Sequence, residues 1–373
     1  MNSSIRGNNY MHQEKLTVNY EGKPAYDIIL DKDFSGLEEA LRSLGLQKRR
    51  FMIITDTNVG KLYLKDCIRI LEAMASSISS FTFEAGENSK NLNTVNLVYQ
   101  GLIEEKFDRS DIIIALGGGV TGDLAGFAAA TYLRGIDFIQ IPTTLLAMAD
   151  SSIGGKTGVD FMAYKNMIGA FHQPKLVYMN LSVLKSLPER EFNSGMSEII
   201  KHGLIKDSGY YRWLSDNKDK IRSLDYETIK QMVIASCKIK KNVVEADPKE
   251  IGERALLNFG HTIGHAIEKL LNFKMLHGEC VAIGMIAAGY ISYRRNLIGK
   301  TDLTNMIELI KSFGLPTGIS GLSPEDIYNV TKLDKKMKSD KIKFILLNKV
   351  GNAVIDMTVS KDEMIEAIKF VLQ

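Results

Sequence analysis

The sequence Asp111-Ile-Ile-Ile-Ala-Leu-Gly-Gly-Gly-Val-Thr-Gly-Asp123 places an unbroken apolar run directly before a cluster of glycines. Such a run is typical of a parallel β-strand that is buried on both faces. Gly117, Gly119 and Gly122 have GxGxxG spacing, which lets a strand turn into a helix whose N-terminal amides can face a phosphate. A tight turn without a ligand is the alternative, because no acidic residue follows about twenty positions later.

The segments on both sides of this turn alternate between strand and helix patterns. Apolar strand-like runs lie at 26–30, 51–55, 81–83, 138–141 and 176–179, and helical patterns lie at 37–44, 67–76 and 94–107. This alternation predicts a doubly wound α/β domain. Asp56, which follows one of these runs, is an alternative partner for a ribose.

The pattern changes after Pro188. Helical patterns dominate at 189–205, 227–246, 260–271, 280–295, 303–313 and 324–331, while 343–347 and 353–357 resemble a hairpin. We therefore expect an α/β domain over residues 13–187 and a mainly helical domain over 188–373. The polar residues 1–12 are expected to extend outside the fold.

Composition excludes several classes of protein. With 45% hydrophobic and 24% charged residues, the chain is an ordinary globular protein, and its 373 residues favour two domains. A net charge of +3 does not indicate nucleic-acid binding, and no apolar run is long enough to span a membrane. The three scattered cysteines form no disulfide framework, which fits a reducing cytosol.

Three of the six histidines lie within Asn258–His277, NFGHTIGHAIEKLLNFKMLH. His261 and His265 are four residues apart in a helical pattern, so they share one helix face. His277 follows a plausible helix end, and two or three imidazoles converging there would suit a divalent metal. A hydrogen-bonded histidine pair is the alternative.

Glu198, on another helical segment, is the carboxylate that would complete a His–His–Glu site with an open coordination position. Lys201 and His202 lie on the same helix face. The alternative is a surface ion pair between Glu198 and Lys201, worth a few tenths of a kcal/mol.

Cations and small residues form further candidates. The segment Asp150–Gly158, DSSIGGKTG, lacks the spacing of a P-loop but suggests a glycine-rich anion-binding loop around Lys156. Arg254 and Asn258 lie at helical spacing, which would aim both toward the histidines. Lys240 precedes them, and Asp334–Lys336 resembles a solvated turn.

Five motifs in this order resemble 3-dehydroquinate synthases of the shikimate pathway. They are GGGVTGDLAGFAAATYLRG, IPTTLLAMADSSIGGKTGVD, KNMIGAFHQP, GMSEIIKHG and ERALLNFGHTIGHAIE, and the match runs from roughly Asp56 to Lys336. The resemblance implies an N-terminal Rossmann-like NAD-binding domain and a helical metal- and substrate-binding domain. It also implies a cytoplasmic enzyme that acts as a homodimer and binds neither nucleic acid nor membrane.

The resemblance assigns site residues. Glu198, His261 and His277 would hold zinc or cobalt, and His265 would lie beside the metal to handle substrate and protons. Sequence spacing alone does not make this choice, because it would also accept His261 and His265 as the two metal ligands. The implied catalytic residues are Lys156, Lys201, Lys240, Arg254, Asn258 and His265. The implied substrate contacts are these six with Arg134, Asp150, Lys165, Asn166 and Lys336, Arg134 being a candidate to act from the other subunit. The implied NAD contacts are Asp56, Asn58, Gly86, Glu87, Lys90, Gly119, Val120, Thr121, Gly122, Asp123, Thr143, Thr144, Lys156, Lys165, Val183, Leu184, Lys185 and Ser186.

The implied reaction converts 3-deoxy-D-arabino-heptulosonate 7-phosphate into 3-dehydroquinate and phosphate. It combines oxidation by NAD, elimination of phosphate, re-reduction, ring opening and aldol closure, so the net reaction is that of a lyase. Two alternatives are a sister sugar phosphate cyclase and a metal-dependent polyol dehydrogenase. An acidic substrate, and therefore 3-dehydroquinate synthase, is favoured over these alternatives by Lys240, Arg254, Asn258 and Lys336.

The sequence departs from the family pattern in one loop. Tyr164 stands where the family usually has glycine, and Asp160 stands where asparagine is common. If the loop requires a left-handed backbone at that glycine position, Tyr164 would be strained there.

Overall fold

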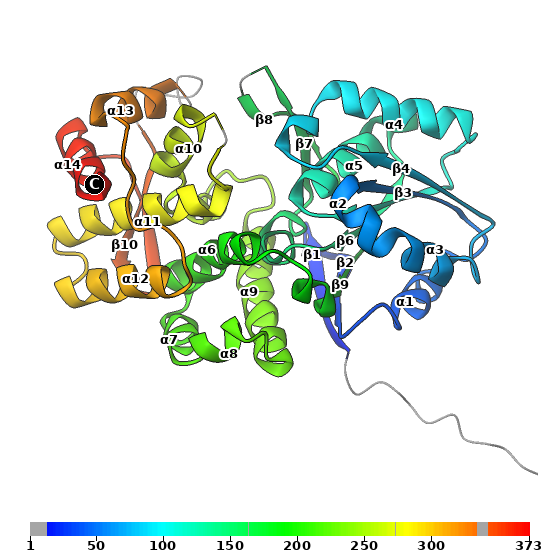
Figure 1. Ribbon diagram of the computed structural model, residues 1–373, viewed down its shortest axis with the longest axis horizontal. Coiled ribbons are helices and arrows are strands. Elements are labelled where there is room, and N and C mark those ends of the chain that lie inside the picture. The colour runs from blue at the N-terminus through cyan, green and yellow to red at the C-terminus, as the bar shows by residue number, and fades with distance from the viewer. Residues whose placement is uncertain (1–12, 163, 273, 334–341) are drawn as a thin grey trace, which may run out of the picture. The chain divides into compact units, whose positions relative to one another are not determined.

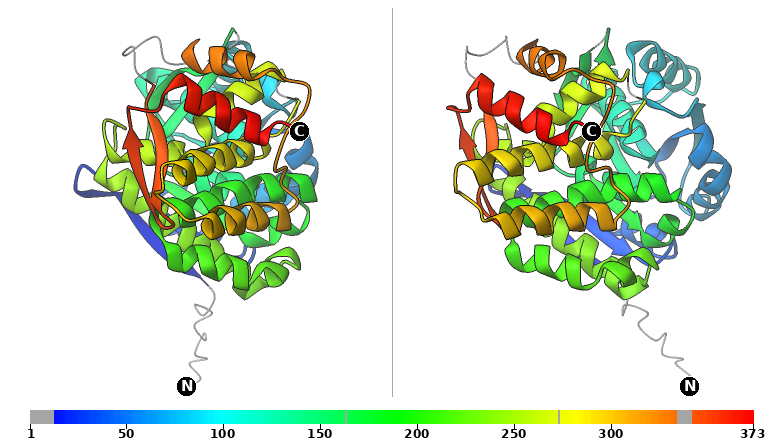
Figure 2. Two further views of the ribbon diagram at one scale, coloured as in Figure 1. Left: turned by 90° about the vertical axis from the view of Figure 1, so that its left-hand side faces the viewer. Right: turned by 60° about the vertical axis from the view of Figure 1, so that its left-hand side comes forward.

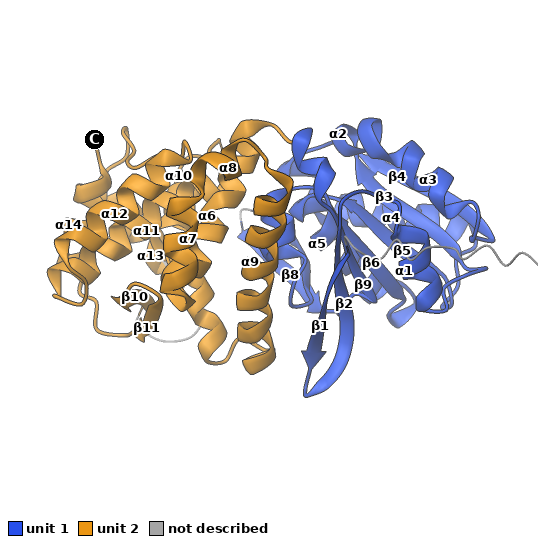
Figure 3. Ribbon diagram, turned by 90° about the horizontal axis from the view of Figure 1, so that it is seen from below, with its two compact units in different colours: residues 1–186 blue, residues 187–373 orange. Residues whose placement is uncertain are grey.

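The computed structural model describes residues 13–162, 164–272, 274–333 and 342–373. The N-terminal extension predicted over residues 1–12 and the predicted substrate contact Lys336 therefore lie outside the described residues. The chain forms two compact units, Met1–Ser186 and Leu187–Gln373, which Figure 3 shows in different colours.

A seven-stranded sheet forms the centre of unit 1 (Figure 1). Its strands are β1 (Glu14–Tyr20), β2 (Lys23–Asp31), β3 (Arg50–Asp56), β4 (Ser77–Phe83), β5 (Ile112–Gly117), β6 (Asp137–Pro142) and β9 (Leu176–Asn180). They lie in the order β1-β2-β9-β6-β5-β3-β4, and all neighbours are parallel except β1 and β2. The sequence pattern did not predict β1, which adds an antiparallel edge.

The predicted central strand is confirmed. Every residue of β5 is buried, and its neighbours β3 and β6 present similarly apolar residues. A hydrophobic cluster that includes residues of β3 and β5 also contains Val95 and Val98 of α4 (Leu92–Glu104) and Leu124 of α5 (Gly119–Thr131). The helical segments of unit 1 are α1 (Leu37–Ser43), α2 (Thr57–Val59), η1 (Gly60–Leu64), α3 (Lys65–Leu71), η2 (Glu87–Ser89), α4 (Leu92–Glu104), α5 (Gly119–Thr131), η3 (Tyr132–Arg134), η4 (Ala147–Ser151) and η5 (Leu181–Lys185).

The segment around Lys156, predicted to be a glycine-rich anion-binding loop, begins a β-hairpin instead of a loop. Strand β7 (Lys156–Phe161) pairs antiparallel with β8 (Tyr164–Phe171). Gly158 has no room for a side chain, because a Cβ there would lie 2.7 Å from the carbonyl oxygen of Ile168. Gly158 therefore serves close strand pairing, whereas Gly154 and Gly155 precede β7 and have left-handed backbone.

The expected strain at Tyr164 is not found. Left-handed backbone occurs in the hairpin at Met162 (φ 54°) and Asn166 (φ 50°), whereas Tyr164 is the first residue of β8. Asparagine tolerates this conformation better than most residues, because its short side chain bonds locally.

Unit 2 is mainly helical. It contains α6 (Glu189–Lys206), α7 (Ser208–Asp216), α8 (Lys218–Arg222), α9 (Tyr226–Ala246), η6 (Glu253–Asn258), α10 (His261–Leu270), α11 (His277–Arg294), α12 (Lys300–Ser312), α13 (Pro324–Leu333), β10 (Phe344–Lys349), β11 (Asn352–Asp356) and α14 (Lys361–Val371). The predicted hairpin is confirmed as β10–β11, while α7, α8 and α14 were not predicted. The N-terminal α/β and C-terminal helical fold class is confirmed.

Helix α11 is the core of unit 2 and packs against α6, α10, α12, α14 and β10 (Figure 2). Glycines allow the closest approaches. A Cβ on Gly264 of α10 would lie 2.8 Å from the carbonyl oxygen of Cys280, and a Cβ on Gly284 would overlap the backbone of Gly260. Because the backbones approach this closely, side chains at the start of α10 and α11 converge.

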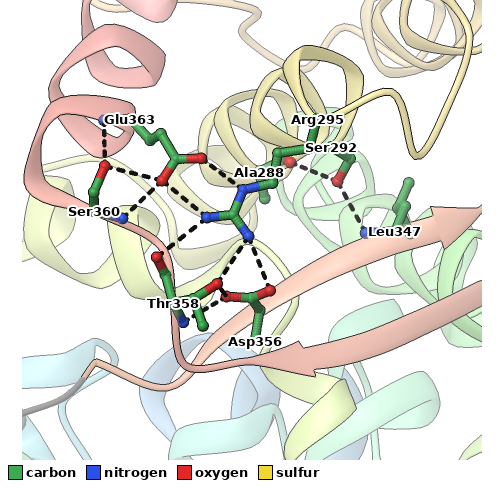
Figure 4. Close-up of polar contacts among 8 residues, drawn as sticks. All are labelled: Ala288, Ser292, Arg295, Leu347, Asp356, Thr358, Ser360 and Glu363. Atoms are coloured by element: carbon green, nitrogen blue, oxygen red, sulfur yellow. Dashed lines mark hydrogen bonds and ion pairs between the residues drawn. The ribbon is translucent and has the colours of Figure 1, made fainter.

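Arg295, immediately after α11, connects this helix to the C-terminal segment (Figure 4). Its guanidinium donates to both oxygens of Glu363 at 2.6 and 2.9 Å and to Asp356 Oδ2 at 2.9 Å. Glu363 also accepts from the backbone amide of Ser360 at 2.8 Å, as part of a capping box at the start of α14. We call Arg295, Asp356, Ser360 and Glu363 the C-terminal clasp.

Candidate functional site

In unit 1, the predicted NAD contacts gather at one edge of the sheet. They follow β3, β4, β5, β6 and β9 in the chain, and these strands are parallel. The strand order β4-β3-β5-β6-β9 reverses direction between β3 and β5, so the topological switch point lies where Asp56 and the glycine turn emerge. Ligands of open α/β sheets bind outside the carboxyl ends of the strands at such a point.

Contacts across the switch point connect the two sides. Asp56 caps α2 by accepting from the amides of Asn58 and Val59 at 2.9 and 3.0 Å. Its other carboxylate oxygen accepts from Thr121 Oγ1 at 3.3 Å. The carboxylate is thus fixed beside the start of α5, where its remaining acceptor capacity can face a ribose.

The glycine turn fits the pyrophosphate of a dinucleotide. Helix α5 begins at Gly119, and no side chain caps its N-terminus. A Cβ on Gly118 or Gly119 would lie 3.1 Å from the side chain of Thr144 or Ser151. Uncapped N-terminal amides and glycines that keep the backbone exposed form the arrangement that binds phosphates.

Asp123, one of the implied NAD contacts, is paired with Lys90. It lies beyond the first turn of α5, and Lys90 Nζ donates to its Oδ2 at 2.6 Å. Burial raises the pKa of Asp123, with Lys90 opposing this change. Lys90 is only 4% exposed and also donates to Asn166 Oδ1 at 2.5 Å, while Lys165 pairs with Glu87 at 3.2 Å. These contacts connect the hairpin β7–β8 to the edge of the unit 1 sheet that carries the predicted NAD contacts.

Arg134 lies away from the other predicted residues of unit 1. It belongs to η3, between the end of α5 and the amino end of β6, and it is exposed. The predicted NAD contacts lie at the carboxyl ends of the strands, so Arg134 occupies the opposite edge of its own sheet.

In unit 2, the three histidines of the segment Asn258–His277 converge. His261 is the first residue of α10 and His277 is the first residue of α11. The ring centroids of His261 and His265 are 5.0 Å apart, those of His261 and His277 are 5.3 Å apart, and those of His265 and His277 are 5.6 Å apart. One ring nitrogen from each histidine lies within 4.8 Å of the other two.

Glu198 approaches two of these histidines from α6. Its Oε1 lies 3.7 Å from Nε2 of His261 and 3.8 Å from Nε2 of His277. Its Oε2 accepts a hydrogen bond from Lys201 Nζ, and both residues are buried at 1% exposure or less. The alternative of a surface ion pair between Glu198 and Lys201 is therefore wrong.

The residues fit a divalent cation. Glu198 Oε1 is buried and accepts no hydrogen bond within the described part of the chain. A buried carboxylate oxygen without a donor is costly, and a cation would satisfy it. Zinc–ligand bonds of about 2.1 Å in a tetrahedron place ligand atoms about 3.4 Å apart, close to the separations of 3.7 and 3.8 Å.

The histidines are prepared to offer lone pairs. His261 Nδ1 lies 3.2 Å from the carbonyl oxygen of Phe259, which can only accept, so Nδ1 carries the proton and Nε2 is free to bind. Burial and the neighbouring cation Lys201 lower the pKa of His261 well below its usual value. A neutral imidazole is the form that coordinates metals.

Lys240 and Arg254 place buried cations in unit 2, at 5% and 3% exposure. The prediction that helical spacing aims Arg254 and Asn258 together needs correction. Both lie on the 3-10 helix η6, where residues four apart do not share a face. Arg254 donates to the carbonyl oxygen of Pro248 at 2.7 Å, and Asn258 donates to Glu250 at 3.0 Å. Contacts between η6 and both α6 and α9 bring this segment to the helices that carry Glu198 and Lys240.

Comparison with known proteins identifies the family. Family models for the 3-dehydroquinate synthase N-terminal and C-terminal regions match residues 80–194 and 195–337. The 3-dehydroquinate synthase of Acetivibrio thermocellus is 44% identical over 354 residues, which cover 95% of this chain and 98% of the relative. The chain belongs to the 3-dehydroquinate synthase family. Its relatives are enzymes, and so is this chain.

Solved structures support the fold of this 3-dehydroquinate synthase family member. A 2-deoxy-scyllo-inosose synthase complexed with carbaglucose-6-phosphate, NAD+ and Co2+ matches with a TM-score of 0.87 at 26% identity, covering 96% of this chain and all of that one. The 2-epi-5-epi-valiolone synthase of Streptomyces hygroscopicus, with NAD+ and Zn2+ bound, has the same TM-score at 24% identity and covers 95% and 99%.

Sequence reasoning missed one acidic residue of this family member's histidine cluster. Glu268 of α10 is 2% exposed, and its Oε2 lies 3.5 Å from Nδ1 of His277. Its signal in the sequence was its position seven residues after His261, which places both side chains on one helix face.

No helix in the described ranges is long and apolar enough to cross a membrane.

Proposed function

We infer that this protein is a 3-dehydroquinate synthase, which converts 3-deoxy-D-arabino-heptulosonate 7-phosphate into 3-dehydroquinate and phosphate. The observation that carries this proposal is the buried Glu198 oxygen facing Nε2 of both His261 and His277. Identity of 44% to curated 3-dehydroquinate synthases over most of the chain supports this substrate among those of the cyclases.

Glu198, His261 and His277 would hold a divalent cation, zinc or cobalt. The cation supplies a Lewis acid that lowers the pKa of a substrate hydroxyl and orients it. Lys201 holds the second oxygen of Glu198, so the first oxygen stays directed toward the two imidazoles. His265 lies within the same cluster and would exchange protons with the substrate.

The carboxyl edge of the unit 1 sheet would bind NAD. NAD would supply a hydride acceptor that gives the hydride back, so the overall reaction would not be a redox reaction and the enzyme would be a lyase. The amides at the start of α5 would bind the pyrophosphate, and Asp56 would bind a ribose. The pair of Lys90 and Asp123 keeps the start of α5 and the β7–β8 hairpin in fixed positions.

Cations would bind the two acidic groups of the substrate. Lys201, Lys240 and Arg254 are buried in unit 2, where a carboxylate or phosphate offsets their desolvation. Lys156, Lys165 and Asn166 come from the β7–β8 hairpin of unit 1 and are assigned to substrate, and Lys156 and Lys165 also to NAD. Cations placed around a leaving phosphate stabilise the charge that develops on it.

The position of Arg134 supports a homodimer. This arginine is assigned to the substrate phosphate, yet within its own chain it lies at the sheet edge opposite the nucleotide residues. A second subunit that supplies Arg134 resolves this separation.

One assay separates the candidate activities. The full-length protein is given the heptulosonate phosphate, NAD and Co2+ or Zn2+, and phosphate release and NADH absorbance are followed together. Phosphate release without accumulating NADH is the expected result. Steady NADH formation from a polyol would favour a dehydrogenase, and turnover only of a sugar phosphate without a carboxylate would favour a sister cyclase.

A further inference from the structure

Contacts within α11 and from α6 hold the backbone around His277 in place. At the start of its helix α11, the carboxylate of Glu279 accepts from the amide of Leu276 at 2.8 Å. Arg190 pairs with the same carboxylate at 2.7 and 2.8 Å, and Ser194 accepts from the amide of Gly278 at 3.1 Å. These contacts fix the position of the His277 backbone, but they do not determine which ring nitrogen of its imidazole faces Glu198.

Glu268 faces the other side of this ring. Its carboxylate lies 3.5 Å from Nδ1 of His277, while Nε2 of His277 lies 3.8 Å from Glu198 Oε1. A carboxylate only accepts hydrogen bonds when ionised, so it favours the tautomer with the proton on Nδ1 and the lone pair on Nε2. The imidazole of His277 is therefore placed between two carboxylates, one on each nitrogen.

The two imidazoles facing Glu198 are oriented in parallel ways. The carbonyl oxygen of Phe259 takes the Nδ1 proton of His261, and Glu268 is in position to take that of His277. His261 and Glu268 lie on the same helix, seven residues apart, so α10 supplies one imidazole and orients the other.

The burial of Glu268 fits a place beside a cation. The residue is 2% exposed, and burying a carboxylate costs several kcal/mol unless charged or polar partners compensate it. Its negative charge, together with that of Glu198, suits a doubly charged cation between α6, α10 and α11, with Lys201 offsetting part of the charge.

We propose that Glu268 is a positioning residue that holds the Nδ1 side of His277, so that Nε2 is directed to the cation beside Glu198. The role rests on the proposed metal site. Partners of metal-bound histidines typically change metal affinity by about 10–100-fold when they are removed.

Binding of Co2+ to the chelator-treated, full-length protein tests this role without depending on turnover. Dissociation constants come from calorimetry, and the visible absorption of Co2+ reports the geometry of its ligands. We expect Glu268→Ala to weaken Co2+ binding about 10–100-fold and to alter the absorption spectrum. Glu268→Gln keeps a neutral acceptor and should weaken binding less, by about 3–10-fold, because hydrogen bonds to ions are about twice as strong as neutral ones.

Glu363→Ala is the matched control, because it removes a carboxylate of unit 2 that belongs to the C-terminal clasp. We expect its Co2+ affinity and spectrum to match those of the wild type, although its stability falls. Wild-type affinity and spectrum in Glu268→Ala would overturn the proposal. Should that variant not fold, wild-type affinity in Glu268→Gln decides against it in the same way. A wild-type protein that binds no Co2+ would instead overturn the metal site itself, and the role of Glu268 with it.

Discussion

Replacing Glu363 by glutamine should destabilise unit 2 by about 1–2 kcal/mol at pH 7 through loss of the charged contact with Arg295. The clasp lowers the pKa of Glu363 from 4.5 to about 2, chiefly through the hydrogen bond from Arg295. At 1.36 kcal/mol for each pKa unit, this difference corresponds to about 3.4 kcal/mol. The side chain is 31% exposed, so solvent screening reduces the expected contribution to about 1–2 kcal/mol.

The pH dependence follows from the same change. The pKa of Glu363 is lower in the folded protein, so its contribution is fully present above about pH 4.5 and is lost as the pH falls toward about 2. More than half of the contribution should be lost by about pH 3. The difference between wild type and Glu363→Gln should shrink accordingly.

Tryptophan fluorescence during urea denaturation measures the free energy of unfolding of unit 2, which contains Glu363. The chain has one tryptophan, Trp213 in α7, so its signal reports the unfolding of unit 2. Glu366→Gln is the matched control, since Glu366 lies three residues further along α14 and pairs with Arg294, the neighbour of Arg295. That pair is about half exposed, so we expect a smaller loss of stability than in Glu363→Gln. Equal losses in the two variants, or a Glu363→Gln loss that does not shrink between pH 7 and 3, would refute the reasoning.

Three further substitutions test the site. His277→Ala should abolish metal binding and activity together, measured by metal analysis and phosphate release, and retained metal stoichiometry would contradict its assignment as a ligand. Lys156→Ala should lower kcat/KM at least about tenfold, because hydrogen bonds to charged groups contribute about 1.5–3 kcal/mol. Lys156 is exposed, so the thermal unfolding of this variant should match that of the wild type. Wild-type kinetics in Lys156→Ala would argue against anion binding by this lysine. Lys201→Met leaves the Glu198 carboxylate buried without its ammonium partner and should destabilise the metal-free protein by about 3–5 kcal/mol. Added Co2+ should then raise its melting temperature more than that of the wild type, and an equal rise would count against a cation beside Glu198.

The sequence alone determined the features that depend on local spacing. The apolar run of β5 and the glycines after it predicted the strand, the turn and helix α5, because burial on both faces and a tight turn each require particular residues nearby. The spacing of His261 and His265 likewise predicted a shared helix face. Only the resemblance to a family separated the proposed ligands from His265.

The hairpin β7–β8 was not predictable from the same rules. Its glycines indicated a loop, since nothing in the local pattern shows that Gly158 packs against the backbone of β8. Similarly, Arg254 and Asn258 have α-helical spacing, but their segment forms a 3-10 helix. Short segments are decided by the contacts available in the folded unit, which local propensity does not include.

The tertiary structure alone decided which atoms face each other in the histidine cluster. Glu198 is distant in sequence from His277, and close packing of α6, α10 and α11 through glycines brings their side chains together. It also placed Glu268 on the far side of the His277 ring and Arg134 at the opposite edge of the unit 1 sheet. Spacing along a chain determines which face of a helix a side chain occupies; the packing of helices distant in sequence determines which nitrogen of an imidazole meets a buried carboxylate.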